Sequence, residues 1–323
     1  MQAIAGSWKE NEFMSTQKEP GSRLPEQAVN AIEQISGTHP GYRRAHAKGI
    51  CCEAVFRPSG AVSEWTTAPH LQQEETRAIM RFSNTNPDPD NRDLLSPAKG
   101  LAVQFLLPDG ARPVIVAATT PVFFARTPES FLEMMQAFQE AKRGGISVKE
   151  IFTDLIGRFP HAKSALASIS ALKPPASFAS RPYYSIHAFY FVDKAGKRRP
   201  VKYEWIPDAG EDHLALVKAP FAGHDYLEKE LAGRLEASPV GFTLRIVRGE
   251  EWDPVDDPTT EWPRDREAID AGQLLVTRIV EEPEGLLMDP TVTGEGIEVS
   301  EDPILRFRKD AYAVSFERRS QGL

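Results

Sequence analysis

A tyrosine with an arginine one helical turn before it is the arrangement with the clearest chemical use in this sequence. Tyr312 follows Arg308 by four residues in the segment DPILRFRKDAYAVSFERR, where Pro303 can open a helix. Residues four apart lie side by side on a helix, so the guanidinium is expected beside the phenol oxygen. A permanent cation there stabilises the phenolate, the form of tyrosine that binds ferric iron. By itself, the pair also fits an ordinary helix surface with a core tyrosine.

A histidine at the start of a strand is the second group of chemical interest. His46 lies in the string RRAHAKG (43–49), just before an apolar segment. A neutral imidazole can take up a proton and return it near neutral pH. A lone histidine at such a position is usually structural, so its surroundings decide its use.

Hydrophobic periodicity predicts two groups of strands separated by helices. A helix opened by Pro25 and stopped by Gly37 precedes the first group. Strands are expected in the segments 49–58, 80–84, 99–110, 112–125, 183–193, 197–208, 212–221, 241–249 and 273–280. Further helices are expected in the segments 127–145, 147–159, 161–172, 225–237 and 302–319. This order is typical of an α+β protein built on one large antiparallel sheet or a closed β-barrel.

The composition is that of an ordinary soluble globular protein, with 323 residues, 41% hydrophobic and 26% charged. The net charge of -8 argues against nucleic acid as a partner. No apolar run is long enough to span a membrane, and the polar N-terminus lacks the pattern of a secretory signal. Cys51 and Cys52 are adjacent and are expected to face opposite sides of a strand. We therefore expect a cytoplasmic protein.

Several common catalytic motifs are absent from the sequence. It contains no G-x-G-x-x-G opening a helix after a strand, no Walker A lysine motif, no C-x-x-C, no H-E-x-x-H and no G-x-S-x-G. Dinucleotide binding through that fingerprint, P-loop phosphate chemistry, zinc peptidase activity and the serine hydrolase elbow are therefore set aside.

Three strings, taken in order along the chain, resemble the core of the haem catalases. They are RRAHAKG, then RFSN with KGLAVQF and ATTPVFFARTPESF, and finally ILRFRKDAY followed by a pair of arginines. The resemblance extends from about Gly41 to Arg319. It implies an α+β fold with an antiparallel β-barrel core of catalase type and flanking helices. It also implies a loose N-terminal arm over 1–23 and a single minimal haem domain over 24–323.

The resemblance implies a haem b whose iron is bound by Tyr312. In catalases the arginine beside this tyrosine is held by a histidine and an aspartate. Arg308, His187 and Asp302 occupy the matching positions here. The set on the tyrosine side of the haem is therefore expected to be complete.

The haem propionates and the haem face are assigned by the same match. Arg43, Arg81 and Arg319 correspond to the arginines that bind the propionates in the family, a task suited to a guanidinium. Phe131 corresponds to a phenylalanine that stacks near the haem. Taken alone, each arginine would be an ordinary surface residue.

On the opposite side of the haem, the resemblance implies that His46 is the acid–base group. It would move a proton between the two oxygens of a peroxide so that the O–O bond breaks heterolytically. Ser83, in RFSN, would hydrogen-bond to His46 and set its tautomer.

The sequence departs from catalases beside this site. Where they carry an asparagine pair, the string here is AATTP, and the catalytic amide aligns with Ala118 or, with a slip of one residue, Thr119. The aspartate of their access channel is missing from the segment SPAKG (96–100). The chain also lacks the long arm, the wrapping region and the helical C-terminal part of full catalases. These features resemble the catalase-related peroxidases, and they predict weak or absent catalase activity.

We expect a peroxidase that uses hydrogen peroxide or organic hydroperoxides to oxidise small organic donors. One alternative is a fatty-acid hydroperoxide isomerase of the allene oxide or epoxyalcohol synthase type, which needs an apolar channel and no donor. Another is a non-enzymatic haem- or lipid-binding barrel, which would have no use for His46. Full catalases interlock through the missing segments, so a homodimer or monomer is expected.

Overall fold

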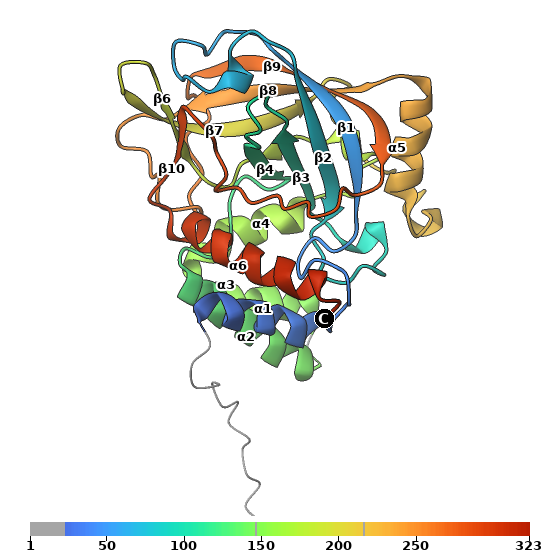
Figure 1. Ribbon diagram of the computed structural model, residues 1–323. Helices are drawn as coiled ribbons and strands as arrows, with labels where there is room; N and C mark the ends of the chain where they lie inside the picture. The colour runs from blue at the N-terminus through green and yellow to red at the C-terminus, as the bar shows by residue number, and fades with distance from the viewer. Residues whose placement is uncertain (1–22, 146, 216) are drawn as a thin grey trace, which may run out of the picture.

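An antiparallel sheet that closes on itself forms the centre of the molecule (Figure 1). The structure, a computed structural model, describes residues 23–145, 147–215 and 217–323. Eight strands follow one another around the barrel in the order β7-β5-β4-β3-β2-β1-β9-β8, and β8 pairs with β7 to close it. They are β1 (Gly49–Pro58), β2 (Thr76–Asn84), β3 (Lys99–Phe105), β4 (Val114–Ala118), β5 (Tyr183–Tyr184), β7 (Arg198–Pro207), β8 (Val240–Arg248) and β9 (Ala268–Val280). Two short strands, β6 (Phe189–Val192) and β10 (Ile297–Val299), extend the sheet beside β7.

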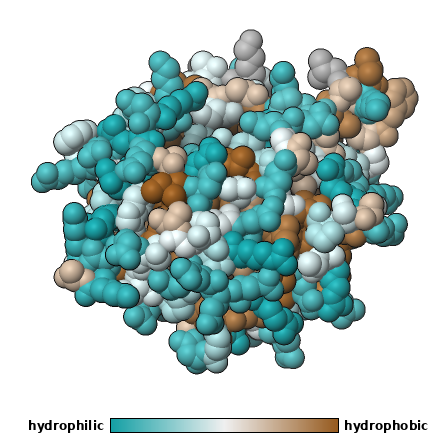
Figure 2. All heavy atoms as spheres, turned by 90° about the horizontal axis from the view of Figure 1, so that it is seen from above, coloured by the Kyte–Doolittle hydropathy of each residue, from teal (hydrophilic) through white to brown (hydrophobic). Residues whose placement is uncertain are grey.

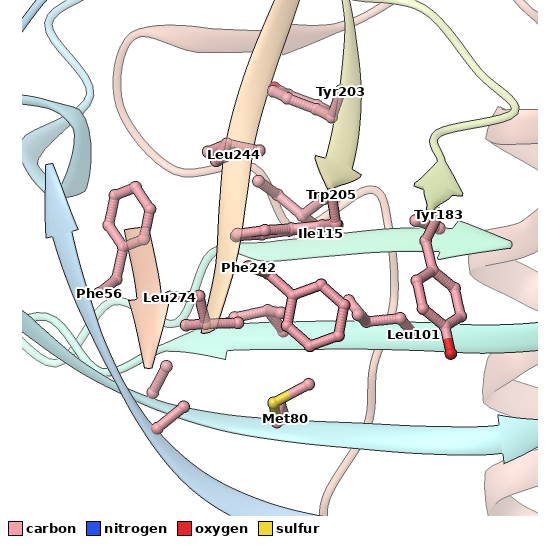
Figure 3. Packing of buried hydrophobic residues seen from close by; sticks show 14 of the residues in the cluster. Phe56, Met80, Leu101, Ile115, Tyr183, Tyr203, Trp205, Phe242, Leu244 and Leu274 are labelled. Atoms are coloured by element: carbon pink, nitrogen blue, oxygen red, sulfur yellow. The ribbon is translucent and has the colours of Figure 1, made fainter. Parts of the chain in front are cut away.

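Alternating burial along the strands fills the barrel with large side chains (Figure 3). Phe56, Trp205 and Phe242 are completely buried there, and the Phe56 ring meets the Trp205 ring edge-on. The adjacent cysteines face opposite ways, as predicted: Cys52 belongs to the barrel core and Cys51 to a separate cluster. The barrel is thus a packed scaffold whose strand ends can hold side chains in fixed positions.

Most of the helices gather at one end of the barrel (Figure 1). They are α1 (Leu24–Ser36), α2 (Pro128–Arg143), α3 (Val148–Arg158), α4 (Lys163–Ala171) and α6 (Pro303–Ser320). A further helix, α5 (Tyr226–Ala237), packs against β9 at the side of the barrel. Thr127 caps α2 by accepting from the Ser130 amide, and Pro128 occupies the first helical position, as predicted. The expected α+β barrel with flanking helices is confirmed.

Three expectations for individual segments need correction. The strand expected at 112–125 is shorter, because β4 ends at Ala118. The strand expected at 212–221 is wrong: the described part of that segment has one isolated bridge, between His213 and Pro175, followed by a turn and a 3-10 helix at Ala219–Phe221. Two of its apolar side chains stay outside the core, since Val217 is 77% exposed and Phe221 is 87% exposed. The strand expected at 183–193 is interrupted, with β5 and β6 separated by four residues. Apart from Arg23, the arm expected at 1–23 lies outside the described residues.

The face of the molecule opposite the helices is mostly hydrophilic, with scattered apolar patches (Figure 2). Within the described ranges, no helix is both long enough and apolar enough to cross a membrane.

A histidine without hydrogen-bond partners is buried in the barrel core. The ring of His70 stacks on Phe105 with a centroid distance of 4.3 Å, and neither ring nitrogen has a partner. Burial lowers the pKa of His70 to about 3, so the folded protein holds this ring neutral. The unfolded chain binds a proton there below about pH 6.5. His70 therefore makes the folded state less stable as the pH falls below that value.

Replacing His70 with leucine is expected to remove this pH dependence. The difference in free energy of unfolding between His70→Leu and the original chain should grow in favour of the variant by about 1.4 kcal/mol when the pH is lowered from 7.5 to 5.5. This change comes from protonation of His70 in the unfolded original chain. Urea unfolding at both pH values measures the difference, and the other buried histidines are common to both proteins. A difference that does not change with pH would contradict the prediction.

Candidate active site

The N-terminus of α6 is fixed by a buried aspartate. Asp302 Oδ1 accepts hydrogen bonds from the amides of Ile304 at 2.8 Å and Leu305 at 3.2 Å. This carboxylate caps the helix, and Pro303 fills the first helical position. This cap fixes the start of α6, and with it the positions of the side chains on the next turns of the helix.

The second oxygen of this aspartate starts a chain of hydrogen bonds that leads to Tyr312. Asp302 Oδ2 lies 2.6 Å from His187 Nδ1. His187 Nε2 lies 3.0 Å from Arg308 Nη1. Arg308 Nη2 then donates to the Tyr312 phenol oxygen at 2.5 Å. The structure thus brings together all four residues that the sequence places on this side of the site.

The chemistry of the guanidinium determines where the protons lie in this chain. Arg308 can only donate, so His187 Nε2 must accept and its proton must be on Nδ1, where it is donated to Asp302. Burial lowers the pKa of His187 against the opposing effect of Asp302, which agrees with a neutral ring. The result is a fixed cation aimed at the tyrosine oxygen.

The interruption between β5 and β6 carries His187 to this position. Ser185 Oγ donates to the His187 carbonyl at 3.0 Å and accepts from the Tyr203 amide at 2.8 Å. These bonds stabilise a bend where a continuous strand was expected. Apolar alternation alone could not predict the bend, because it depends on a serine that replaces regular strand pairing.

A cavity of about 450 Å³ lies between α6 and the adjacent ends of the barrel strands. Tyr312, His46, Ala118 and Phe131 all contribute to its wall. Most of its lining is apolar, including residues of α1, α2 and α6. A mainly apolar cavity with a few converging polar groups is the usual form of a cofactor or substrate site.

His46 has an unusual backbone and a closely fitted ring. Its φ angle is 56°, in the left-handed region, and its Nδ1 lies 2.9 Å from Ser83 Oγ. A Cβ on Gly100 would come within 2.7 Å of the ring and 2.8 Å of the serine oxygen, so only glycine fits. Burial, with the nearby charges of Arg81, Arg308 and Arg43, lowers the pKa of His46 to about 3. The ring is therefore a neutral base at ordinary pH.

Three arginines from distant parts of the chain meet at the cavity rim. Arg43, Arg81 and Arg319 all line the cavity, and all three also contact Glu282. Arg43 Nη1 lies 2.5 Å and Arg319 Nη1 lies 3.0 Å from a Glu282 carboxylate oxygen. Burial and the neighbouring Arg43 lower the pKa of Arg81 to about 10. Glu282 itself is not among the cavity-lining residues, so it contacts the arginines from outside the cavity.

Glu282 was not among the site residues predicted from the sequence. It lies two residues after β9, whose pairing with β1 sets Val280 opposite Cys51. The only available signal was indirect, because three arginines expected at one place need a counter-charge.

Phe131 belongs to a group of three aromatic rings at the cavity wall. Its ring lies 6.1 Å from that of Phe123 and 5.7 Å from that of Phe124, both in stacked orientation. All three rings line the cavity, so this side offers a flat apolar surface.

The position that could correspond to the missing amide is also defined. Ala118, at the end of β4, lines the cavity. Thr119 instead faces β3: its Oγ1 accepts from the Lys99 amide at 3.0 Å, and it is not among the cavity-lining residues. Of the two alignments left open by the sequence, the geometry therefore favours Ala118.

The fold is that of a catalase-type barrel, and comparisons with known proteins agree. A model of the catalase family matches residues 26–322. The chain belongs to the catalase family.

Individual relatives refine this placement. A catalase-related peroxidase of Synechococcus elongatus is 32% identical over 93% of this chain and 89% of its own length. A catalase-related peroxidase of Mycolicibacterium paratuberculosis is also 32% identical, over 93% of this chain and 96% of its own. Catalase isozyme 1 of Nicotiana tabacum is 27% identical, and only 60% of its length is covered. The chain thus resembles the short relatives over nearly their whole length.

Solved structures share the fold. A bacterial catalase superposes with a TM-score of 0.77 at 21% identity, over 99% of this chain and 67% of that one. Catalase A from Saccharomyces cerevisiae gives a TM-score of 0.75 at 20% identity, over 87% of this chain and 62% of that one.

Proposed function

We propose that the protein is a haem b peroxidase, with Tyr312 as the ligand of the iron. The hydrogen-bond chain from Asp302 to the Tyr312 oxygen is the observation that carries this proposal. A phenol that ends such a chain, with a guanidinium at its oxygen, is prepared to carry a negative charge at the cavity wall. An ordinary core tyrosine has no need of this arrangement.

The cavity residues fit a haem in three respects. The aromatic group around Phe131 offers a flat apolar wall. Arg43, Arg81 and Arg319 provide cations at the rim for two propionates. The buried Nε of Arg81 makes no hydrogen bond and has only a 3.4 Å ion-pair contact with Glu282, so this donor could also serve an anionic group at the rim. When bound, the haem would supply the redox centre that takes up the oxidising equivalents of the peroxide.

His46 would handle the proton of the peroxide. In the tautomer with its proton on Nδ1, the ring donates to Ser83 and keeps a lone pair on Nε2. Nε2 can then accept a proton from one peroxide oxygen and deliver it to the other, which favours heterolytic cleavage of the O–O bond. The lowered pKa keeps this nitrogen unprotonated and ready to act.

The proposed substrates are hydrogen peroxide or organic hydroperoxides together with a small organic electron donor. Ala118 offers no amide to hold hydrogen peroxide beside His46, so dismutation should be weak. The names of the two relatives that match nearly full length support peroxidase activity. We also propose a cytoplasmic location, since both cysteines are free, and a monomer or homodimer.

The proposal is tested by the absorption spectrum of the protein purified after expression with haem supply, followed by a peroxide titration. A Soret band with the features of phenolate ligation is expected, and its absence would refute the haem assignment. Donor oxidation should exceed oxygen release from hydrogen peroxide. Turnover of a fatty-acid hydroperoxide without any donor would instead support the isomerase alternative, for which the apolar cavity wall is the favouring observation.

Introducing an amide at the cavity wall should raise dismutation. Ala118→Asn is expected to increase the rate of oxygen release from hydrogen peroxide by about tenfold or more, as one added hydrogen bond to a reacting group can do. Thr119→Asn is the matched control, because that side chain is bonded to β3 outside the cavity. Oxygen electrode measurements on both variants check this. Equal rates for Ala118→Asn and the original chain would show that the missing amide does not limit dismutation.

A further inference from the structure

The backbone of His46 is held in a conformation that needs support. Among the non-glycine residues of the described ranges, it alone has a positive φ angle. A side chain in the left-handed region costs on the order of 1 kcal/mol or more, and the conformation persists where the surroundings enforce it. A base that must reach a reacting atom depends on such enforcement, because a small misplacement slows proton transfer.

The guanidinium of Arg81 provides the enforcing contacts. Its Nη1 donates to the His46 carbonyl at 3.0 Å, and its Nη2 donates to the Ala47 carbonyl at 3.0 Å. Two consecutive carbonyls are thus bound by one rigid fork. A Cβ on Gly49 would lie only 2.5 Å from Arg81 Cζ, so this glycine leaves the space that the fork occupies.

One strand therefore controls both parts of His46. Arg81 and Ser83 are two residues apart on β2, and side chains at this spacing project from the same face of a strand. Arg81 binds the backbone at His46, while Ser83 binds its ring. The register of β2 against β1, which pairs Ser83 with Gly49, fixes this strand beside the entry to β1.

The other two rim arginines are bonded differently. Arg43 and Arg319 each donate to the Leu286 carbonyl and to Glu282. Neither has a hydrogen bond to the His46 or Ala47 carbonyl. In Arg81, by contrast, Nη1 and Nη2 each bind one of these carbonyls, and Nε lies 3.4 Å from a Glu282 oxygen.

We propose that Arg81 is a positioning residue for His46, which it holds in its left-handed conformation, and that this is a task the other two rim arginines do not share. This proposal rests on the proposed role of His46 as the base. It assigns different tasks to three arginines that sequence comparison treats alike.

The test compares Arg81→Gln with Arg319→Gln. Both remove one positive charge from the same cluster, but only the first removes the fork from the His46 backbone. Hydrogen–deuterium exchange of the peptide covering 43–49 is the first readout, with the Ala47 amide, bonded to the Asn86 carbonyl at 3.2 Å, as reporter. Exchange there should accelerate about tenfold or more in Arg81→Gln, the effect of losing one or two buried hydrogen bonds, and about twofold at most in Arg319→Gln.

Cyanide binding to the haem-loaded protein is the second readout, since hydrogen cyanide must give up its proton to the base near the iron. Per loaded molecule, the association rate should fall more in Arg81→Gln than in Arg319→Gln, and Arg81→Lys should recover part of it. Arg319→Gln should mainly speed the loss of haem. Arg81→Lys with Arg319→Lys repeats the comparison if Arg81→Gln does not fold.

Equal exchange at 43–49 in the two glutamine variants, or no change in either Arg81 variant, would overturn the proposal. The exchange measurement does not require haem. A protein that binds no haem would refute the proposed function, while the positioning role of Arg81 could still be decided.

Discussion

Replacing Tyr312 with phenylalanine is expected to abolish stable haem binding. The ring volume is conserved, so the fold should survive, but the oxygen that ends the chain from Asp302 is lost. Arg308 keeps its bond to His187 but loses the tyrosine oxygen as the acceptor of Nη2, which adds the cost of a half-buried donor without a partner. Removing a residue that only orients a metal ligand costs about 10–100-fold in affinity, so removing the ligand should cost more.

Titration of haem into the protein, followed by absorption, measures this effect. Tyr42→Phe is the matched control, because its ring is 48% exposed and lies outside the cavity lining. His187→Gln should give a smaller loss, since it acts through Arg308. An unchanged affinity and spectrum in Tyr312→Phe would refute the ligand assignment.

Replacing His46 with glutamine should leave haem binding in place and slow the reaction with peroxide. Positioned acid–base groups contribute about 10²–10⁴-fold, and an amide nitrogen cannot accept the proton. Because burial and the neighbouring arginines lower the pKa of His46 to about 3, the histidine stays neutral as the pH falls through its usual range. The rate in the original chain should therefore stay level from pH 8 to pH 5, rather than fall near pH 6.5.

Stopped-flow mixing of haem-loaded protein with peroxide across this range checks both statements. His39→Gln is the control: its ring bonds to the Ser36 carbonyl and does not line the cavity. A rate for His46→Gln that matches the control would remove His46 from the mechanism. A midpoint near pH 6.5 in the original chain would show a base more accessible to water than the structure places it.

Local signals made the helices and the hairpin of β3 and β4 predictable. Pro303 and the spacing of Arg308 and Tyr312 were sufficient to predict the last helix and the contact between these two side chains. The hydrogen bonds of His187 to Asp302 and to Arg308, by contrast, join residues more than a hundred positions apart. Hydrophobic periodicity gives no information about contacts between distant residues, so these contacts were expected only from the resemblance to catalases.

The failures have equally physical causes. The segment 212–221 was expected to be a strand, yet its described part pairs only through a single bridge between His213 and Pro175, and Val217 and Phe221 remain exposed. Glu282 has no local motif at all, because its significance comes from three arginines supplied by other parts of the chain. The backbone angle of His46 is likewise set by Arg81, a contact across 35 positions.

The arginine cluster also limits which porphyrins the cavity should accept. Three guanidiniums and the single carboxylate of Glu282 leave two positive charges without compensation at the rim. The two propionates of a haem would supply that deficit, whereas a porphyrin with esterified side chains would leave the cations unmatched. The choice between tetrapyrroles would then depend on the net charge at one edge of the ring as much as on the shape of the pocket. Glu282 would determine that net charge, because its carboxylate neutralises one of the three arginines.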